Sequence, residues 1–279
     1  MQEHYFEKDK IYYRTNEWKP ERFTLVIIHG ASGSSSAWWP YEKIFENKYN
    51  LLTYDIRGHG MSKKYPNYED YEVKNFVNDF EELLEYLKIS KFILWSSSFG
   101  TLIAREYLRL HRDRVLALIF TSTENYEEDE FMLKIIRPFL SVVVAIVKYL
   151  PSKSKPRGHV DYSKIYNSDR SIQRNIADMR NTGFRAQFYT LKQSFHKRQE
   201  HDLDKINIPT LIIHGEKDSL VPVKNALAFS KKIKNAEFVS IPNFDHDVHH
   251  NAVKEMSEAI ESFIEKHKAE LKSSLKLLF

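Results

Sequence analysis

The chain has 279 residues, of which 42% are hydrophobic and 14% aromatic, and this is enough for one large α/β domain or for a core domain with an insertion. The 42 basic and 38 acidic residues are interspersed and give a net charge of +4, which argues against a nucleic-acid-binding protein because such proteins concentrate their basic residues. The chain has no cysteine, which excludes disulfides and thiolate metal sites and fits a cytoplasmic protein.

Two segments were compared with what a signal peptide and a membrane-spanning helix require. The amino terminus, MQEHYFEKDK, is charged and lacks an apolar core, so we expect no signal peptide. Residues 131–150 are the most hydrophobic segment, but its longest uncharged run, residues 138–147, is well short of the ~20 apolar residues that a membrane-spanning helix needs. The sequence therefore predicts a soluble protein.

Short apolar runs alternate with longer helical patterns along most of the chain. Residues 4–17 predict two strands around a Lys-Asp turn. Further strands are predicted at residues 23–30, 50–56, 91–96, 115–122, 209–215 and 236–242. Helices are predicted at residues 73–88, 98–111 and 251–267. Several strands are apolar throughout, as expected when both faces are covered, so the pattern predicts a mostly parallel sheet between layers of helices.

The alternation stops between about Glu124 and Lys205. This part has helical and loop-like patterns, with Pro, Ser and Lys breaks, but no convincing strand. We therefore expect a helical cap at residues 125–205, inserted into a core of residues 1–124 and 206–279.

The stretch FILWSSSFGTLIA, residues 92–104, places three serines between a predicted strand and a predicted helix. A nucleophilic serine at such a junction stands on a tight turn, which requires small residues two positions before it and two positions after it. Only Ser98 meets this requirement, because its flanking residues are Ser96 and Gly100. Since Ser96 stands where glycine is usual, a second interpretation stays open, in which a serine hydroxyl only caps the helix that begins near Phe99.

Five motifs in order resemble the α/β-hydrolase family, and the resemblance covers nearly all of the chain. Besides the turn at Ser98 they are LVIIHGASGSSSAWW, LLTYDIRGHGMS, LIIHGEKDSLVP and IPNFDHDVHH. The likeness is closest to serine esterases and acylglycerol lipases. It implies the α/β-hydrolase fold, with a mostly parallel eight-stranded sheet, helices on both faces and a helical cap between strands 6 and 7.

The resemblance also implies the roles of individual residues. Ser98 matches the nucleophile, His246 the base that takes its proton, and Asp218 the carboxylate that orients the base. The backbone N–H groups of Ala31 and Phe99 are implied as donors to the oxyanion. The order of the three side chains along the chain is the one expected of this fold, and no cofactor is implied.

Alternatives remain for some of these roles. Glu124 follows a predicted strand and is an alternative acid, because some members of the family place theirs there. The run DHDVHH, residues 245–250, offers metal ligands, but its spacing does not match a helical H-E-x-x-H site and no second cluster stands out, so we predict no metal site.

Two regions are candidates for contact with the substrate. Trp38 and Trp39 follow the oxyanion loop and are candidates for the pocket lining, although aromatic residues there are more often core. Residues 142–147, including Val144, are apolar on every side, so they either pack over the sheet or line a pocket for a medium or long acyl chain.

The sequence thus predicts a serine hydrolase that cleaves carboxylic esters through an acyl-enzyme. Its expected substrate is a small-molecule ester or a lipid, in particular one with a medium or long acyl chain such as a monoacylglycerol. Three other reactions of the same fold stay open: thioester hydrolysis, carbon–carbon bond hydrolysis of a diketone, and an aminopeptidase acting on N-terminal proline. For the aminopeptidase, Glu124, Glu127 and Glu128 offer an acidic site for the substrate amine. A binding protein that has lost the reaction is the alternative from another class.

The expected partners follow from charge and hydrophobicity. We expect no nucleic-acid partner, and the sequence predicts no particular oligomeric state. Lys148, Lys153, Lys155 and Arg157, together with the tail LKSSLKLLF, favour weak association with anionic membrane surfaces.

Overall fold

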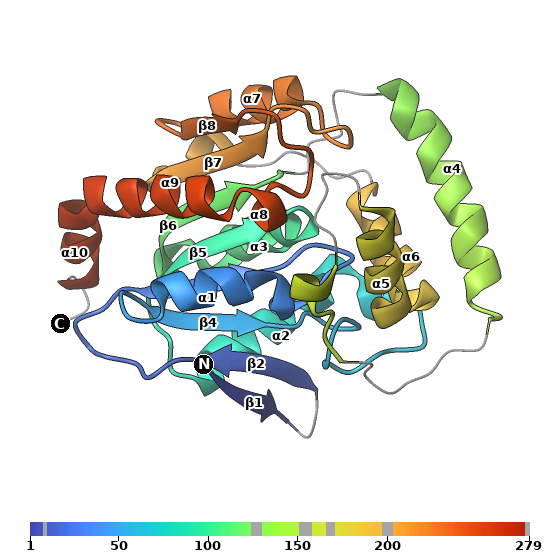
Figure 1. Cartoon of the computed structure of the whole chain (residues 1–279), viewed down its shortest axis with the longest axis horizontal. Coiled ribbons are helices and arrows are strands. Elements are labelled where there is room, and N and C mark those ends of the chain that lie inside the picture. The colour runs from blue at the N-terminus through green and yellow to red at the C-terminus, as the bar shows by residue number, and fades with distance from the viewer. Residues whose placement is uncertain (8–9, 124–129, 151–157, 166–170, 197–202, 277–279) are drawn as a thin grey trace.

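The computed structural model describes residues 1–7, 10–123, 130–150, 158–165, 171–196 and 203–276 (Figure 1). Within these residues, eight strands form one sheet: β1 (Gln2–Phe6), β2 (Ile11–Thr15), β3 (Thr24–Ile28), β4 (Asn50–Tyr54), β5 (Phe92–Ser97), β6 (Val115–Thr121), β7 (Thr210–Gly215) and β8 (Glu237–Ile241). Their order across the sheet is β1-β2-β4-β3-β5-β6-β7-β8.

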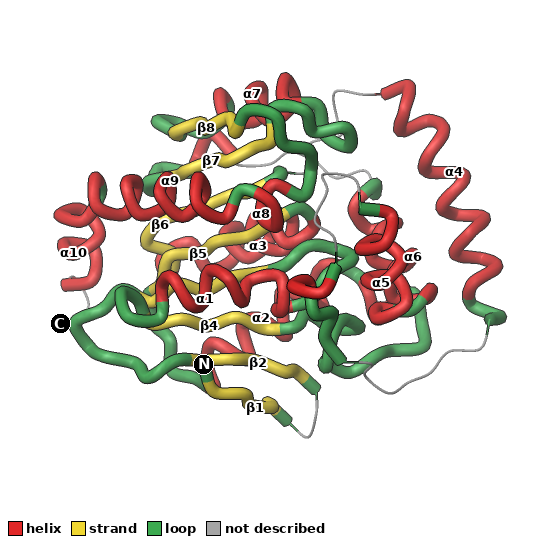
Figure 2. The backbone as a smooth tube through the Cα atoms, in the orientation of Figure 1, coloured by secondary structure: helices red, strands yellow, loops and turns green. Residues whose placement is uncertain are grey.

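The α-helices in the described part of the chain are α1 (Trp39–Phe45), α2 (Val73–Tyr86), α3 (Phe99–His111), α4 (Glu130–Val147), α5 (Ile172–Thr182), α6 (Phe184–Ser194), α7 (Val223–Lys231), α8 (Val248–Asn251), α9 (Val253–Lys266) and α10 (Lys268–Lys276). None of them is long and apolar enough to cross a membrane. Figure 2 shows the strands as one layer with helices in front of it and behind it.

The sheet is mostly parallel, as predicted. β1 and β2 form an antiparallel hairpin at one edge, and β2 is antiparallel to β4. All neighbours from β4 to β8 run parallel. β5 lies between β3 and β6, where its Ser96 is in register with Ile28 on one side and with Phe120 on the other. The prediction of an eight-stranded, mostly parallel sheet with helices on both faces is confirmed.

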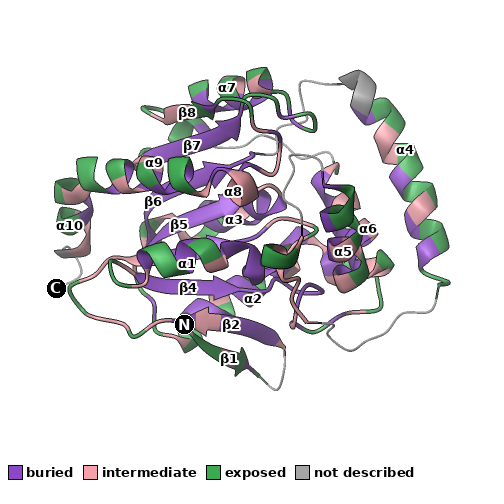
Figure 3. Ribbon diagram, viewed as in Figure 1, coloured by how far each residue is buried: buried purple, intermediate pink, exposed green. Residues whose placement is uncertain are grey.

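Both faces of the sheet are buried, which explains why the strand sequences are apolar throughout. On one face, strand residues such as Ile27 and Trp95 pack in one cluster with side chains of α1 and α9. On the other face, their neighbours Ile28 and Leu94 pack in a second cluster with side chains of α2 and α3. Successive residues of a strand point to opposite faces, so each apolar strand supplies both clusters. Figure 3 shows the strands at the centre of the sheet in the colour of buried residues.

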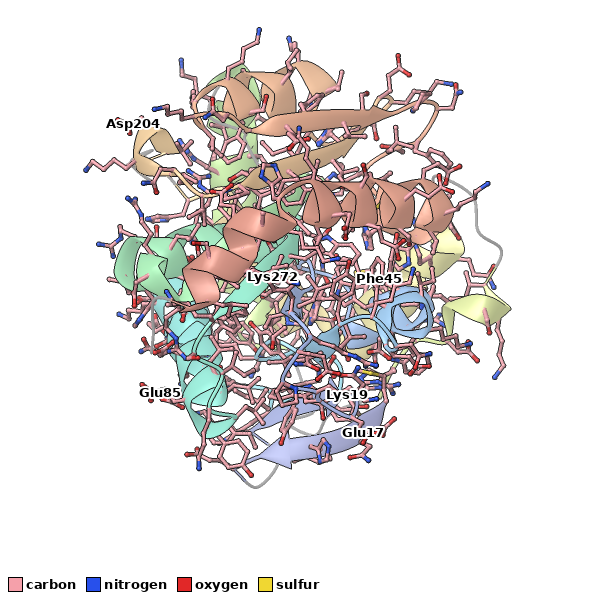
Figure 4. The ribbon with its side chains drawn as sticks, turned by 90° about the vertical axis from the view of Figure 1, so that its left-hand side faces the viewer. Glu17, Lys19, Phe45, Glu85, Asp204 and Lys272 are labelled. Atoms are coloured by element: carbon pink, nitrogen blue, oxygen red, sulfur yellow. The ribbon has the colours of Figure 1, made fainter. Side chains whose placement is uncertain are left out.

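The parallel strands end at the same edge of the sheet, and α5 and α6 lie beyond that edge with α4 outside them (Figure 1). These three helices come from the chain between β6 and β7. This is the place at which the sequence predicts a cap, although the exact cap boundaries, residues 125–205, stay a prediction. The opposite end of the molecule, viewed in Figure 4, carries charged side chains of both signs, including Glu17, Lys19, Glu85, Asp204 and Lys272.

Candidate active site

Ser98 lies at the junction between β5 and α3. Its backbone has φ 48° and ψ −122°, a conformation that residues with a side chain rarely adopt. Two hydrogen bonds hold the turn: the Ser98 N–H donates to the Thr121 carbonyl at 3.0 Å, and the Thr101 N–H donates to the Ser98 carbonyl at 2.8 Å. A strained turn of this kind projects the serine hydroxyl beyond the end of its strand.

The neighbours of Ser98 show why this turn needs small residues. A Cβ atom on Gly100 would lie 2.8 Å from the carbonyl oxygens of both Ile28 and His29, closer than such atoms pack. Ser96, on the other side, is fully buried in β5, and within the described residues its hydroxyl has no hydrogen-bond partner. The sheet thus accommodates the small side chain of Ser96 where the family pattern has glycine.

Three side chains from different parts of the chain meet at this turn. His246 follows β8, and its Nε2 atom lies 3.0 Å from Ser98 Oγ. Its Nδ1 atom lies 2.8 Å from Oδ2 of Asp218, which follows β7. The arrangement gives a hydroxyl, a base within reach of its proton, and a carboxylate on the far nitrogen of that base, as nucleophilic catalysis by serine requires.

Asp218 is held as a carboxylate. Its Oδ1 atom accepts hydrogen bonds from the N–H groups of Leu220 and Val221, at 2.9 and 2.8 Å. Its Oδ2 atom is 3.0 Å from Nε2 of the buried His214 as well as close to His246. Burial by itself raises the pKa of Asp218, but the charge of His246 and the hydrogen bonds from His214 and His246 lower that pKa well below its usual value. The carboxylate is therefore ionised and can stabilise an imidazolium at His246.

The loop after β3 lies against Ser98. A Cβ atom on Gly30 would be only 3.1 Å from Ser98 Cβ, so the backbone on either side of Gly30 runs next to Ser98. The Ala31 carbonyl is 2.6 Å from Nε2 of the buried His59, and burial lowers the pKa of His59 to about 3. Its Nδ1 atom lies 2.9 Å from the Arg57 carbonyl, so the neutral ring, which donates from one nitrogen, lies between the loop after β3 and the turn at Arg57.

The two residues implied as oxyanion donors are Ala31, in the loop after β3, and Phe99, at the start of α3. Ala31 lines the cavity that contains Ser98 and His246. Phe99 is the first residue of α3, so its N–H is one of the helical N–H groups that have no partner within the helix. The Phe99 ring points into the core, 5.1 Å from that of Phe76, which leaves only its backbone for the site.

The cavity at Ser98 has a volume of about 180 Å³. The core side of its lining is residues 29–33 with Ala37, Ser98, Leu220, His246, Asp247, His249 and His250. The cap side is Asn175 and Asp178 of α5 and Leu191 of α6. The cavity is thus covered on its cap side by two helices of the segment between β6 and β7, and its lining is more apolar than polar.

Comparison with known proteins places the chain in a family. The family model described as serine aminopeptidase, S33 (Hydrolase_4), matches residues 19–252. The chain belongs to this family of α/β-hydrolases. The α/β-hydrolase resemblance of the sequence is thereby confirmed.

Several relatives of this S33 hydrolase are known. It is 25% identical to the proline iminopeptidase PfmaB of Pestalotiopsis fici, over 82% of this chain and 88% of that protein. It is 24% identical to the monoacylglycerol lipase ABHD6 of Bos taurus, over 81% of this chain and 70% of that protein. The α/β-hydrolase MGS-M2, from a Medee basin deep-sea metagenome library, superposes with a TM-score of 0.72 at 21% identity, over 94% of this chain and 97% of that one, and so shares the fold.

A group of polar side chains joins the cap of this S33 hydrolase to its core. The Tyr162 hydroxyl donates a 2.6 Å hydrogen bond to Asp178 Oδ1, and Arg174 of α5 forms an ion pair with Asp247. Burial raises the pKa of Asp178 to about 7, although the bond from Tyr162 and the charge of Arg174 oppose the rise. Asp178 therefore changes charge near neutral pH while lining the cavity.

The side chains of the run DHDVHH, residues 245–250, make contacts with different parts of the fold. His246 contacts Ser98, Asp247 pairs with Arg174, His249 packs 5.2 Å from the Trp38 ring, and His250 packs against Tyr162. Within the described residues, no group of three or more His, Asp or Glu side chains is placed to hold a metal ion.

The structure corrects both predicted substrate contacts. Trp38 is fully buried and packs with its ring centre 4.7 Å from that of Trp95, so it is a core residue and does not line the cavity. Trp39, the other candidate, is also absent from the lining. Val144 is buried in the cluster that contains Ala186 and Tyr189 of α6, and none of residues 142–147 lines the cavity. Glu124, the alternative acid, lies outside the described residues, as do Glu127 and Glu128.

The lining residues on the cap side, Asn175, Asp178 and Leu191, were all missed by the sequence analysis. They lie in helices whose patterns are typical of any surface helix, so nothing local distinguishes them. Ser171, whose hydroxyl accepts from the Arg174 N–H at 3.2 Å, caps the start of α5 and is a signal for that helix. This cap does not indicate which face of α5 lies toward Ser98.

Proposed function

We propose that this S33 hydrolase cleaves carboxylic esters through an acyl-enzyme formed on Ser98. The observation that carries the proposal is the chain of two short contacts, 3.0 Å from Ser98 Oγ to His246 Nε2 and 2.8 Å from His246 Nδ1 to Asp218. This chain stands at a strained strand-to-helix turn and opens into a cavity, so both the nucleophile and the space for a substrate are supplied.

In the proposed reaction, His246 Nε2 takes the proton of Ser98 as Oγ attacks the ester carbonyl carbon. The N–H groups of Ala31 and Phe99 donate to the oxygen that becomes negatively charged. The tetrahedral intermediate then expels the alcohol, which takes the proton from His246. A water molecule, deprotonated by His246, attacks the acyl-enzyme. Ser98 Oγ then leaves as it takes this proton back from His246, and the acid is released. Asp218 stabilises the imidazolium during both steps.

The cavity bears on the size of the acyl group. Its volume of about 180 Å³ is below the roughly 300–1,000 Å³ typical of ligand pockets. Because residues 142–147 do not line it, the geometry gives no support to a long acyl pocket in α4. We infer that the best simple ester has a short acyl chain, and that a monoacylglycerol would keep much of its chain outside this cavity.

A second candidate function is that of an aminopeptidase. The position of Asp178 in the cavity lining favours it. The Asp178 carboxyl lines the cavity from the cap side, where an ionised carboxylate could bind a substrate ammonium group. The likeness to a proline iminopeptidase gives further support to this candidate. The two candidates share Ser98, His246 and Asp218, and differ only in the bond that is cleaved.

The test is hydrolysis of p-nitrophenyl esters with two, four, eight and twelve acyl carbons, with the p-nitroanilide of L-proline measured beside them. Wild type is compared with Ser98→Ala and with Ser97→Ala, a matched control because Ser97 is the neighbouring serine, is fully buried and makes no hydrogen bond through its hydroxyl within the described residues.

We expect the two- and four-carbon esters to be cleaved fastest, with at least a ~10³-fold loss in Ser98→Ala and little change in Ser97→Ala. Faster cleavage of the twelve-carbon ester would contradict the inferred acyl size but leave ester hydrolysis standing. Cleavage of the anilide alone would favour the aminopeptidase. Inertness toward all five substrates would reject both candidates.

A further inference from the structure

Helix α4 exposes a row of large apolar side chains. Ile135, Phe139, Val142 and Ile146 are each between 57% and 59% exposed, and Tyr149, just after the helix, is 79% exposed. Their spacing of three and four residues places them on one face of a helix. We call these five residues the α4 stripe.

The opposite face of α4 is already used for packing. Leu133, Leu140, Val144 and Val147 are at most 8% exposed, and the last two join the core cluster that contains Ala186 and Tyr189 of α6. The helix is therefore fixed to the cap with the stripe turned outward. Figure 1 shows α4 as the outermost element at this end of the molecule, and Figure 3 shows exposed residues along it. Contiguous exposed apolar surface of this kind marks a site of interaction.

Beyond Glu130, the first residue of α4, the charges along the stripe have one sign. Residues 131–160 contain no acidic residue and six basic ones: Lys134, Arg137, Lys148, Lys153, Lys155 and Arg157. The rest of the chain has 36 basic and 38 acidic residues, so the excess positive charge of the protein comes from this segment. Among the described residues, Lys134 and Lys148 are exposed on α4 and directly after it. The opposite end, by contrast, mixes both signs (Figure 4).

These charges distinguish between two partners for the stripe. If two copies of the chain met through their stripes, each would bring Lys134 and Lys148 into or beside the contact, against a single α4 carboxylate, Glu130, so the positive charges would outnumber the negative ones. An anionic lipid surface has the complementary charge, and it accepts apolar side chains just below its headgroups.

We propose that the α4 stripe docks on anionic phospholipid membranes. The five apolar side chains enter the boundary between headgroups and acyl chains, while Lys134 and Lys148 contact the phosphate groups. The contact is peripheral, since no described helix can span a bilayer. Helices α5 and α6, which supply Asn175, Asp178 and Leu191 to the cavity, lie between α4 and the sheet, so docking turns the active-site end of the molecule toward the lipid.

The test is flotation of the full chain with vesicles of phosphatidylcholine alone or with 30% phosphatidylglycerol, at low and high salt. The stripe variant is Phe139→Asp with Ile146→Asp. Its control is Leu110→Asp with Leu227→Asp, which adds the same charge at exposed leucines of α3 and α7. The charge variant is Lys134→Glu with Lys148→Glu, and its control is Lys224→Glu with Lys254→Glu at exposed lysines of α7 and α9.

We expect wild type to float with the anionic vesicles at low salt, less at high salt, and little with phosphatidylcholine alone. The stripe and charge variants should each reduce the bound fraction at least tenfold, while both controls bind as wild type does. Hydrolysis of a short water-soluble ester and the melting temperature report whether each variant is folded.

Three outcomes would overturn the proposal. The first is that wild type does not float with anionic vesicles at low salt. The second is that the stripe variant binds as wild type does; should that variant fail to fold, wild-type binding by the charge variant counts in the same way. The third is that light scattering without lipid finds a wild-type dimer that the stripe variant converts to a monomer, because a second copy would then cover the stripe.

Discussion

Asp245 accepts a hydrogen bond from the backbone N–H of Ser219 at 2.7 Å, and so joins the turn that carries Asp218 to the loop that carries His246. The same Oδ1 atom accepts the N–H of His246 at 2.7 Å and the Ser219 hydroxyl at 2.9 Å. Ser219 follows Asp218 directly, so one buried carboxylate fixes the backbone beside both partners of the 2.8 Å contact between Asp218 and His246. The positions of Asp218 and His246 therefore depend on Asp245, a residue that takes no part in the proposed reaction.

Replacing Asp245 should impair the reaction without abolishing substrate binding. Asp245→Ala leaves two N–H groups without their acceptor and frees the loop, and a displacement of about 1 Å can cost on the order of 10²-fold in rate. We expect kcat to fall by roughly that factor with KM nearly unchanged, and Asp245→Asn to recover most of the activity because its amide oxygen accepts the same bonds. Steady-state kinetics of both variants check this. A kcat of Asp245→Ala within twofold of wild type would show that the loop needs no such support.

Adding one methyl group at Gly100 should damage the site, whereas removing the hydroxyl at Ser96 should not. The Gly100→Ala methyl group would lie 2.8 Å from two carbonyl oxygens, which forces β3 or α3 to move. Overpacking of this kind costs about 1–3 kcal/mol of the free energy of unfolding. We expect at least a ~10-fold loss of kcat/KM and a lower melting temperature. Ser96→Ala, the matched variant on the other side of Ser98, should stay within about twofold of wild type, because its hydroxyl has no hydrogen-bond partner within the described residues. Equal effects of the two substitutions would argue against this account of the turn.

The stability of the protein should depend on the ionisation of Asp178. Its folded-state pKa of about 7 lies above the value of about 3.9 for an unfolded chain, so between roughly pH 4 and 7 the folded state binds more protons. The free energy of unfolding therefore falls as pH rises through this interval. Asp178→Asn removes the buried charge, so its melting temperature should exceed that of wild type by several degrees at pH 8 and by little at pH 5.

Thermal melts at the two pH values check the Asp178 prediction. The control is the exposed Asp204→Asn, which should melt as wild type does at both. If Asp178→Asn melts at or below the wild-type temperature at pH 8, burial does not disfavour the ionised form of this carboxyl.

Most of the sheet could be predicted from the sequence because its signal is local. Strands such as β3 and β7 are covered on both faces, so they are continuous apolar runs bounded by charged or turn residues. The helices α1 and α7 were not predicted. Both helices are short and so give little periodic pattern, and α1 begins at Trp39 in a stretch that the motif pattern assigns to the end of a loop.

The same reasoning explains which site residues could be predicted. Ser98 is identified by a steric rule on its own neighbours, and His246 and Asp218 by motifs at strand ends. The role of Asp178 depends on how α5 packs over the sheet, which no local pattern states. The predictions that Trp38 and Val144 contact the substrate were wrong for a related reason. A large apolar side chain near a site suits the core as well as a pocket, and only the packing decides between them.

The most direct test of the central claim is to react the protein with a fluorophosphonate and to map the modified residue by mass spectrometry. Wild type and Ser97→Ala should carry one phosphonyl group on the peptide that contains Ser98, Ser98→Ala should carry none, and His246→Ala should react much more slowly because its serine keeps its proton. Modification of another serine, or no modification of wild type, would contradict the account in which Ser98 is the nucleophile of this fold.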